Sequence, residues 1–193
     1  MYFNKEETET ALYYFFMKAD GNISYDEMKM FNELCKTNNI NGDTKENILK
    51  YCNDFSGTSK DFIGSLILKD KSSSGTRAYL SIVSSTLFPN TITKSEQAKI
   101  IWNLVNLGYS DTVFSDEEKE FINYLITEWK FDKVIYQEMI DTAETLLALT
   151  KQKDWLLSTY QRGALRDKKE KKIDDDMEKL HSDILLSIKE YAM

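Results

Sequence analysis

The sequence predicts an all-α protein: a multi-helix bundle that contains a duplicated helix–loop–helix unit. Apolar residues recur at three- and four-residue spacing along most of the chain, as they do on one face of a helix. The single proline, Pro89, leaves the expected helix interiors unbroken, and one short acidic motif occurs twice. Hydrophobic residues make up 41% of the 193 residues, which is enough to form a buried core.

Helix starts can be placed from side chains that accept hydrogen bonds from free backbone N–H groups. The expected starts are Asn4, Ser24, Asp43 or Thr44, Thr93, Ser115 and Asp132. Two further helices are expected over residues 59–68 and 77–88. A strand is the alternative for the second of these, because it is rich in Ser, Thr, Ile and Val.

The C-terminal part contains a run, residues 166–176, in which every position except Ile173 is charged. We expect 155–165 to continue helically into this run, and Asp174 to Asp176 to lie at the positive end of a last helix. The run is either a solvated helix or a contact patch, since its bases precede its acids. The last helix carries an apolar stripe expected to face a core, with a partner-binding surface as the alternative: Met177, Leu180, Ile184, Ile188 and Tyr191.

Two domains are expected: residues 1–150 as the duplicated helical domain, and 151–193 as a C-terminal helical extension that packs on it or projects from it. The net charge of −7 argues against nucleic-acid binding, which needs a basic surface. The two cysteines, Cys35 and Cys52, are expected to be reduced and buried. No signal peptide or membrane-spanning run is evident, so a cytoplasmic location without direct membrane insertion is expected.

The acidic motif repeats at an offset of 91 residues. Residues 19–27 (ADGNISYDE) align with residues 110–118 (SDTVFSDEE), and both read Asp-x-x-apolar-Ser-x-acid-Glu. An apolar helix is expected before each copy and an amphipathic helix after it. Such spacing indicates that a helical unit was duplicated, with the two copies packed about a pseudo-twofold axis.

Part of the motif is explained by helix capping. Ser24 with Glu27, and Ser115 with Glu118, form capping boxes in which each side chain binds a free backbone N–H group. Capping does not explain Asp20 and Asp111, although either could close its loop as an Asx turn. An EF-hand is rejected, because its first two ligand positions fall on apolar or basic residues in both copies.

If the two copies face each other, the carboxylates of Asp20, Glu27, Asp111 and Glu118 converge. Four such groups repel one another, so they either take up protons or hold a divalent cation. Calcium or magnesium is the expected ion, because both prefer oxygen ligands. Capping and surface charge remain the alternative explanation.

The helix ending at Asp20-Gly21-Asn22-Ile23-Ser24, followed by an amphipathic helix and a second acidic copy, resembles the TerB-like family associated with tellurite resistance. The resemblance covers roughly residues 8–150 and implies an all-helical fold with metal ions at Asp20, Glu27, Asp111 and Glu118. It also implies a role in stress-response or phage-defence systems at the inner face of the membrane, reached through a partner. The second copy has Thr112 where the family has glycine, and the segment between the copies is unusually long.

No catalytic constellation is found, so the chain is not expected to be an enzyme. The only histidine, His181, lies among polar residues of the last helix, and no phosphate loop, catalytic triad or zinc spacing occurs. The leading hypothesis is a TerB-like scaffold that binds a divalent cation and a protein partner. The alternatives are an acidic helical inhibitor or regulator, of mobile-element origin and without a metal site, and a metal-assisted hydrolase.

Overall fold

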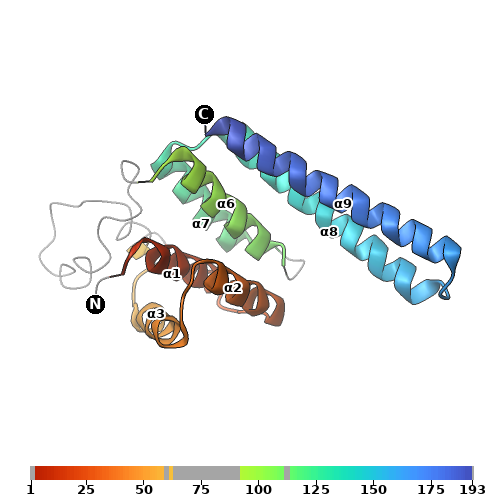
Figure 1. The fold of residues 1–193 in the computed structure, drawn as a ribbon. Coiled ribbons are helices and arrows are strands. Elements are labelled where there is room, and N and C mark those ends of the chain that lie inside the picture. Colours follow the sequence, from red (N-terminus) through yellow and green to blue (C-terminus); the bar gives the residue numbers. More distant parts are fainter. Residues whose placement is uncertain (1–2, 59–60, 63–91, 111–113, 193) are drawn as a thin grey trace, which may run out of the picture. The chain divides into compact units, whose positions relative to one another are not determined.

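The computed structural model describes residues 3–58, 61–62, 92–110 and 114–192. These residues are largely helical and include no strand, which confirms the all-α class (Figure 1). The chain forms two compact units, Met1–Phe131 and Asp132–Met193. The helices expected over 59–68 and 77–88 lie outside the described residues, apart from the helical pair 61–62.

The first unit contains five of the labelled helices, and a capping side chain precedes each of them. They are α1 (Lys5–Met17), α2 (Tyr25–Thr37), α3 (Gly42–Asp54), α6 (Lys94–Gly108) and α7 (Asp116–Trp129). The predicted caps Asn4, Ser24, Thr93 and Ser115 are confirmed. The predicted start of α3 at Asp43 or Thr44 is wrong. Asn41 caps this helix instead, because its side chain accepts from the backbone N–H of Thr44.

Helix α1 is the centre of the first unit. Every residue from Thr8 to Met17 is buried, and α1 contacts α2, α3, α6 and α7. A helix can be surrounded in this way only if it is apolar on nearly all sides or its polar groups find partners. Both conditions hold here. Apolar residues dominate its second half, and the buried Glu9 is hydrogen-bonded.

A buried polar network joins α1 to α6. The hydroxyl of Tyr13 donates to Oε1 of Glu9 over 2.6 Å, and Nδ2 of Asn103 donates to the Tyr13 hydroxyl over 2.8 Å. The ammonium of Lys99 lies 3.5 Å from the same Glu9 oxygen. Burial, and then the charge of Glu9, raise the pKa of Tyr13 well above its usual value, so this phenol stays a neutral donor.

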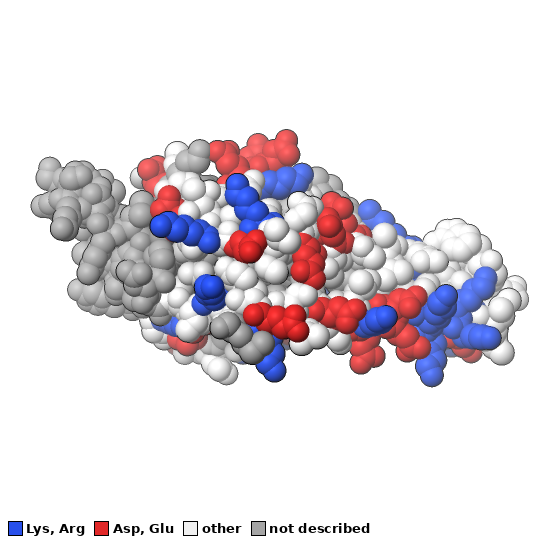
Figure 2. Space-filling view, turned by 90° about the horizontal axis from the view of Figure 1, so that it is seen from above, with Lys and Arg blue, Asp and Glu red and all other residues white. Residues whose placement is uncertain are grey.

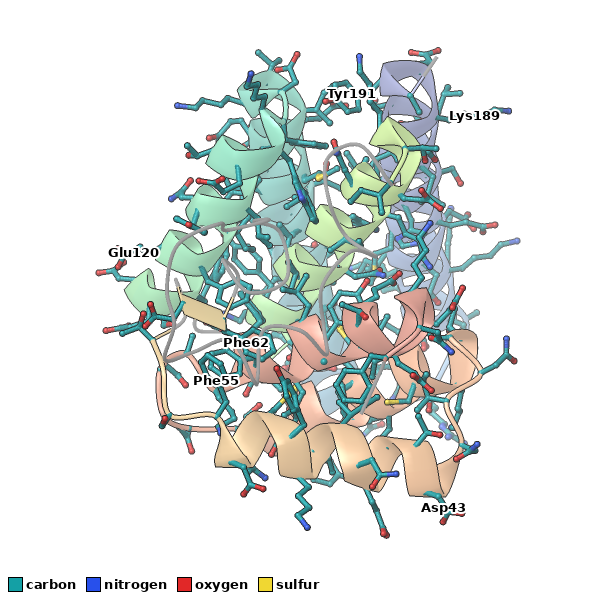
Figure 3. The ribbon with its side chains drawn as sticks, turned by 90° about the vertical axis from the view of Figure 1, so that its left-hand side faces the viewer. Asp43, Phe55, Phe62, Glu120, Lys189 and Tyr191 are labelled. Atoms are coloured by element: carbon teal, nitrogen blue, oxygen red, sulfur yellow. The ribbon has the colours of Figure 1, made fainter. Side chains whose placement is uncertain are left out.

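Aromatic rings fill the space between α1 and the end of α3. Phe15 stacks on Phe62 with ring centroids 3.8 Å apart. Phe55 meets Phe62 edge-on, with centroids 5.2 Å apart (Figure 3). On another side of α1, Phe16 meets Phe121 of α7 at 5.4 Å. Edge-on and stacked pairs of this kind add to the stabilisation given by burial alone.

The second unit is a helical hairpin of α8 (Lys133–Thr159) and α9 (Ala164–Tyr191). Its buried apolar residues are Met139, Ala143, Leu156, Ile173, Ile184 and Ile188. The expected cap Asp132 is confirmed, because its side chain accepts from the N–H of Val134. The stripe predicted for the last helix does face a core, formed with α8.

The structure differs from three expectations in the second unit. The helix does not continue from 155 through 165, because α8 ends at Thr159 and Gly163 has an extended backbone. Asp174 to Asp176 therefore lie in the middle of α9 and not at its positive end. The expected domain boundary at 150 falls inside α8, which runs without a break to Thr159, and the second unit begins at Asp132.

Cys35 and Cys52 are free and buried, as expected. Burial raises the pKa of Cys35 to about 11 and that of Cys52 to about 12, which keeps both as unreactive thiols near neutral pH. None of the described helices has the length and apolar character needed to cross a bilayer.

Candidate acidic site

The first acidic turn joins α1 to α2. The backbone N–H of Gly21 donates to the Lys18 carbonyl over 3.1 Å, and Gly21 has a φ of +83°, which favours glycine. The carboxylate of Asp20 accepts from the N–H of Asn22 over 2.9 Å, so the predicted Asx turn is present. Asp20 itself is exposed.

Ser24 then begins α2 with a capping box. The Ser24 hydroxyl accepts from the N–H of Glu27 over 3.1 Å, and Oε2 of Glu27 accepts from the N–H of Ser24 over 2.6 Å. These two bonds fix the Glu27 carboxylate at the helix start, where it also meets the positive end of the helix dipole. Only 3% of Glu27 is exposed.

The second turn repeats this capping at the start of α7. The Ser115 hydroxyl accepts from the N–H of Glu118 over 3.1 Å, and Oε2 of Glu118 accepts from the N–H of Ser115 over 2.8 Å. Only 2% of Glu118 is exposed. Asp111, the counterpart of Asp20, lies outside the described residues. The matching caps fit a duplication, which itself stays a prediction.

The two turns come close enough for their charges to interact. The pKa of Glu118 is raised to about 7, first by burial and then by the negative charges of Glu27 and Asp20. The hydrogen bonds from Ser115 oppose this rise but do not cancel it. Three of the four predicted acids, drawn from segments about 90 residues apart, therefore share one electrostatic environment.

The geometry stops short of a formed metal centre. Among the residues that the structure describes, no group of three or more His, Cys, Asp or Glu side chains is arranged to hold a metal ion. Glu27 and Glu118 each use one carboxylate oxygen for a cap. The chemistry of the donors nevertheless suits calcium or magnesium, because carboxylates are the ligands these ions prefer.

Close packing behind the second turn accounts for a glycine at the end of α6. A Cβ atom at Gly108 would lie 2.5 Å from Cδ2 of Phe114, the buried residue just before Ser115. Phe114 also packs against the ring of Tyr109, with centroids 5.0 Å apart. The absence of a side chain at 108 thus allows the residue that precedes the second cap to pack against α6.

Replacing Gly108 by alanine is therefore expected to destabilise the protein. The clash with Phe114 should cost about 1–3 kcal/mol and outweigh the roughly 1 kcal/mol that alanine contributes within a helix. Denaturant unfolding measures the difference. Gly42→Ala is the matched control, since a Cβ there meets nothing within 4 Å. Equal stabilities of the two variants would contradict this account of Gly108.

Sequence reasoning missed two features of the structure. The burial of Glu9 could not be predicted from the sequence, because a glutamate within a helical pattern usually faces water. The exposure of Trp155 was also missed, since an aromatic residue in a periodic helix usually belongs to a core. His181 is exposed on α9.

Comparison with known proteins does not assign the chain to a family. No family model, no curated protein and no solved structure matches the chain. The case for its function therefore depends on its own residues.

Proposed function

We propose that this chain is a non-catalytic, TerB-like helical protein that binds a divalent cation through its paired acidic turns. The observation that carries the proposal is the burial of Glu118, only 2% exposed, within reach of the negative charges of Glu27 and Asp20 from the other turn. A buried carboxylate beside like charges is stabilised either by a proton or by a cation. Calcium or magnesium would supply the missing positive charge.

In this proposal, Glu27 and Glu118 provide fixed oxygen ligands, since the capping boxes already hold their carboxylates at the helix starts. Asp20 and Asp111 would complete the site from the two turns. An ion would then bind the two copies together and stiffen the contact of α1 and α2 with α6 and α7. The stiffened surface would act as a scaffold for a protein partner in a stress-response system of the tellurite or phage-defence type.

The test is thermal unfolding with and without calcium, magnesium or manganese. A cation at about 100 times its dissociation constant stabilises the folded state by about 2.7 kcal/mol, which should raise the melting temperature by several degrees. Asp20→Asn and Glu118→Gln should each remove this rise. Glu117→Gln, an exposed neutralisation in the same first turn of α7, should keep it.

A melting temperature that none of the three cations changes would contradict the metal site. The chain would then fit the alternative of an acidic helical inhibitor or regulator, which needs no ion. An effect of the cations that persists in both Asp20→Asn and Glu118→Gln would place the ion elsewhere.

A further inference from the structure

Charge is segregated along the hairpin of the second unit. Residues 151–172, here called the hairpin tip, contain eight Lys or Arg residues and three Asp or Glu residues. Residues 174–190 contain six acidic and two basic residues. Figure 2 shows basic side chains gathered at the end of the hairpin where α8 and α9 are joined, with acidic ones farther along it. A basic tip on a chain with a net charge of −7 needs an explanation.

The basic groups at the tip are largely available to a partner. Two of the eight are exceptions. Lys153 pairs with Asp174 at 2.7 Å and with Glu170 at 3.7 Å, and the half-buried Arg166 donates to the Tyr160 carbonyl over 3.2 Å. The pairing of Lys153 with Glu170 also neutralises one of the three acids of the tip. The exposed bases are Lys151, Arg162, Lys168, Lys169, Lys171 and Lys172.

Large apolar side chains are exposed at the same end. Trp155 is 58% exposed and Leu165 is 62% exposed, on the last turns of α8 and the first turn of α9. Trp155 is held edge-on against Tyr160 at 5.8 Å, and the ammonium of Lys169 lies 4.7 Å from the centre of the Tyr160 ring. The aromatic groups and the bases thus form one surface.

A groove of about 390 Å³ opens on this surface. Its apolar lining is Trp155 with the buried Leu156 and Ile173. Its polar lining consists of two bases, one acid and one amide: Lys169, Lys172, Asp176 and Gln152. Apolar surface next to ammonium groups suits a ligand with a negative head and an apolar body. The lysine stems can lie along such a body while their charges reach the head.

We propose that the hairpin tip docks on the surface of an anionic lipid bilayer. Lysines would bind the lipid phosphates, and Trp155 and Leu165 would enter the boundary between head groups and acyl chains. This pairing of basic and apolar groups matches the two contributions that hold peripheral proteins on membranes. No helix needs to cross the bilayer. The proposal is independent of the cation site in the first unit.

The position of the acids favours a membrane over a nucleic acid. A flat anionic surface can meet the tip end-on, so that of Asp174 to Asp176 it approaches only Asp176, which lines the groove beside Lys169 and Lys172. An extended strand of phosphates lying along α9 would instead meet these three acids directly. Leu165 also fits a lipid better than a nucleic acid, whose bases stack on aromatic rings but not on an aliphatic side chain.

The test is co-sedimentation of the full chain with vesicles, combined with tryptophan fluorescence. Vesicles of phosphatidylcholine and phosphatidylglycerol in equal parts should bind the protein at low salt, and vesicles of phosphatidylcholine alone should not. Of the three tryptophans, Trp102 and Trp129 are buried, so a blue shift on binding would report Trp155. Raising the salt concentration should weaken the binding.

Lys169→Glu/Lys172→Glu should lower the vesicle partition coefficient at least tenfold, and Trp155→Ala should lower it and remove the blue shift. Lys29→Glu/Lys50→Glu, which makes the same change in net charge on exposed positions of α2 and α3, should bind as the wild type does. Far-UV circular dichroism checks that each variant is folded. Equal losses in the two double variants would overturn the proposal, as would equal binding to neutral vesicles. Tighter binding to single-stranded DNA than to anionic vesicles would overturn it in favour of a nucleic acid.

Discussion

Between about pH 5 and pH 8, the free energy of unfolding is expected to fall by up to about 3 kcal/mol through the titration of Glu118. The folded-state pKa of Glu118 is about 7, against an ordinary value of 4.5. Between pH 4.5 and about pH 7 the folded state holds a proton that the unfolded state has released. Stability from this group is therefore complete below pH 4.5 and is lost as the pH rises through 7.

Glu118→Gln isolates this contribution. Glutamine keeps the capping box, because its side-chain oxygen can still accept from the backbone N–H of Ser115, and it carries no charge to titrate. Chemical unfolding is measured at a series of pH values. The difference in unfolding free energy between wild type and variant should change by about 1–3 kcal/mol between about pH 5 and pH 8. Glu117→Gln, at an exposed position in the same turn, should leave the slope as in the wild type.

If the difference in unfolding free energy between wild type and Glu118→Gln did not vary with pH, the raised pKa of Glu118 would be disproved, and with it the burial of this carboxyl group beside Glu27 and Asp20. The same measurement also bears on the cation. A bound divalent ion favours the ionised carboxylate, so a saturating concentration should flatten the slope of the wild type. Glu117→Gln should respond to the ion as the wild type does.

Tyr13→Phe should destabilise the protein by about 2–3 kcal/mol, although it removes a single oxygen atom. That oxygen donates to Glu9 over 2.6 Å and accepts from Asn103 over 2.8 Å. Without it, the buried carboxylate of Glu9 loses its closest donor, and of its partners in the described part of the chain Lys99, 3.5 Å away, remains. Hydrogen bonds to charged groups are worth more than neutral ones, and a buried charge left short of partners costs its desolvation.

Tyr14→Phe is the matched control for this variant. The hydroxyl of Tyr14 makes a longer bond, 3.3 Å to Oδ1 of Asn53, in a partly buried place. Its loss should cost less than about 1 kcal/mol. Denaturant unfolding compares both variants with the wild type. Similar losses of unfolding free energy in Tyr13→Phe and Tyr14→Phe would show that the hydrogen bonds around Glu9 contribute little to stability.

Much of the local structure could be read from the chain itself. Ser24 and Glu27 predict a helix start, because the side chain of each accepts a hydrogen bond from a backbone N–H group of the same turn. Such bonds need only residues that are neighbours in the sequence. Thr93 and Ser115 follow the same rule. The predictions were wrong where one local pattern was compatible with two structures. Asn41, and not Asp43 or Thr44, caps α3. A helix was predicted to run through 155–165, but α8 ends at Thr159 and α9 begins after Gly163.

The sequence by itself determined the helical class, most helix starts and the identity of the acidic residues, because these follow from periodicity and from bonds within one turn. Tertiary structure alone decided that Glu118 is buried beside Glu27 and Asp20, and that Trp155 is exposed while Glu9 is enclosed. Burial and electrostatic coupling depend on which helices meet, and segments far apart in the chain meet only after packing. The sequence identifies Glu118 as a capping residue, and only its packed surroundings show that its carboxyl group also titrates near neutral pH.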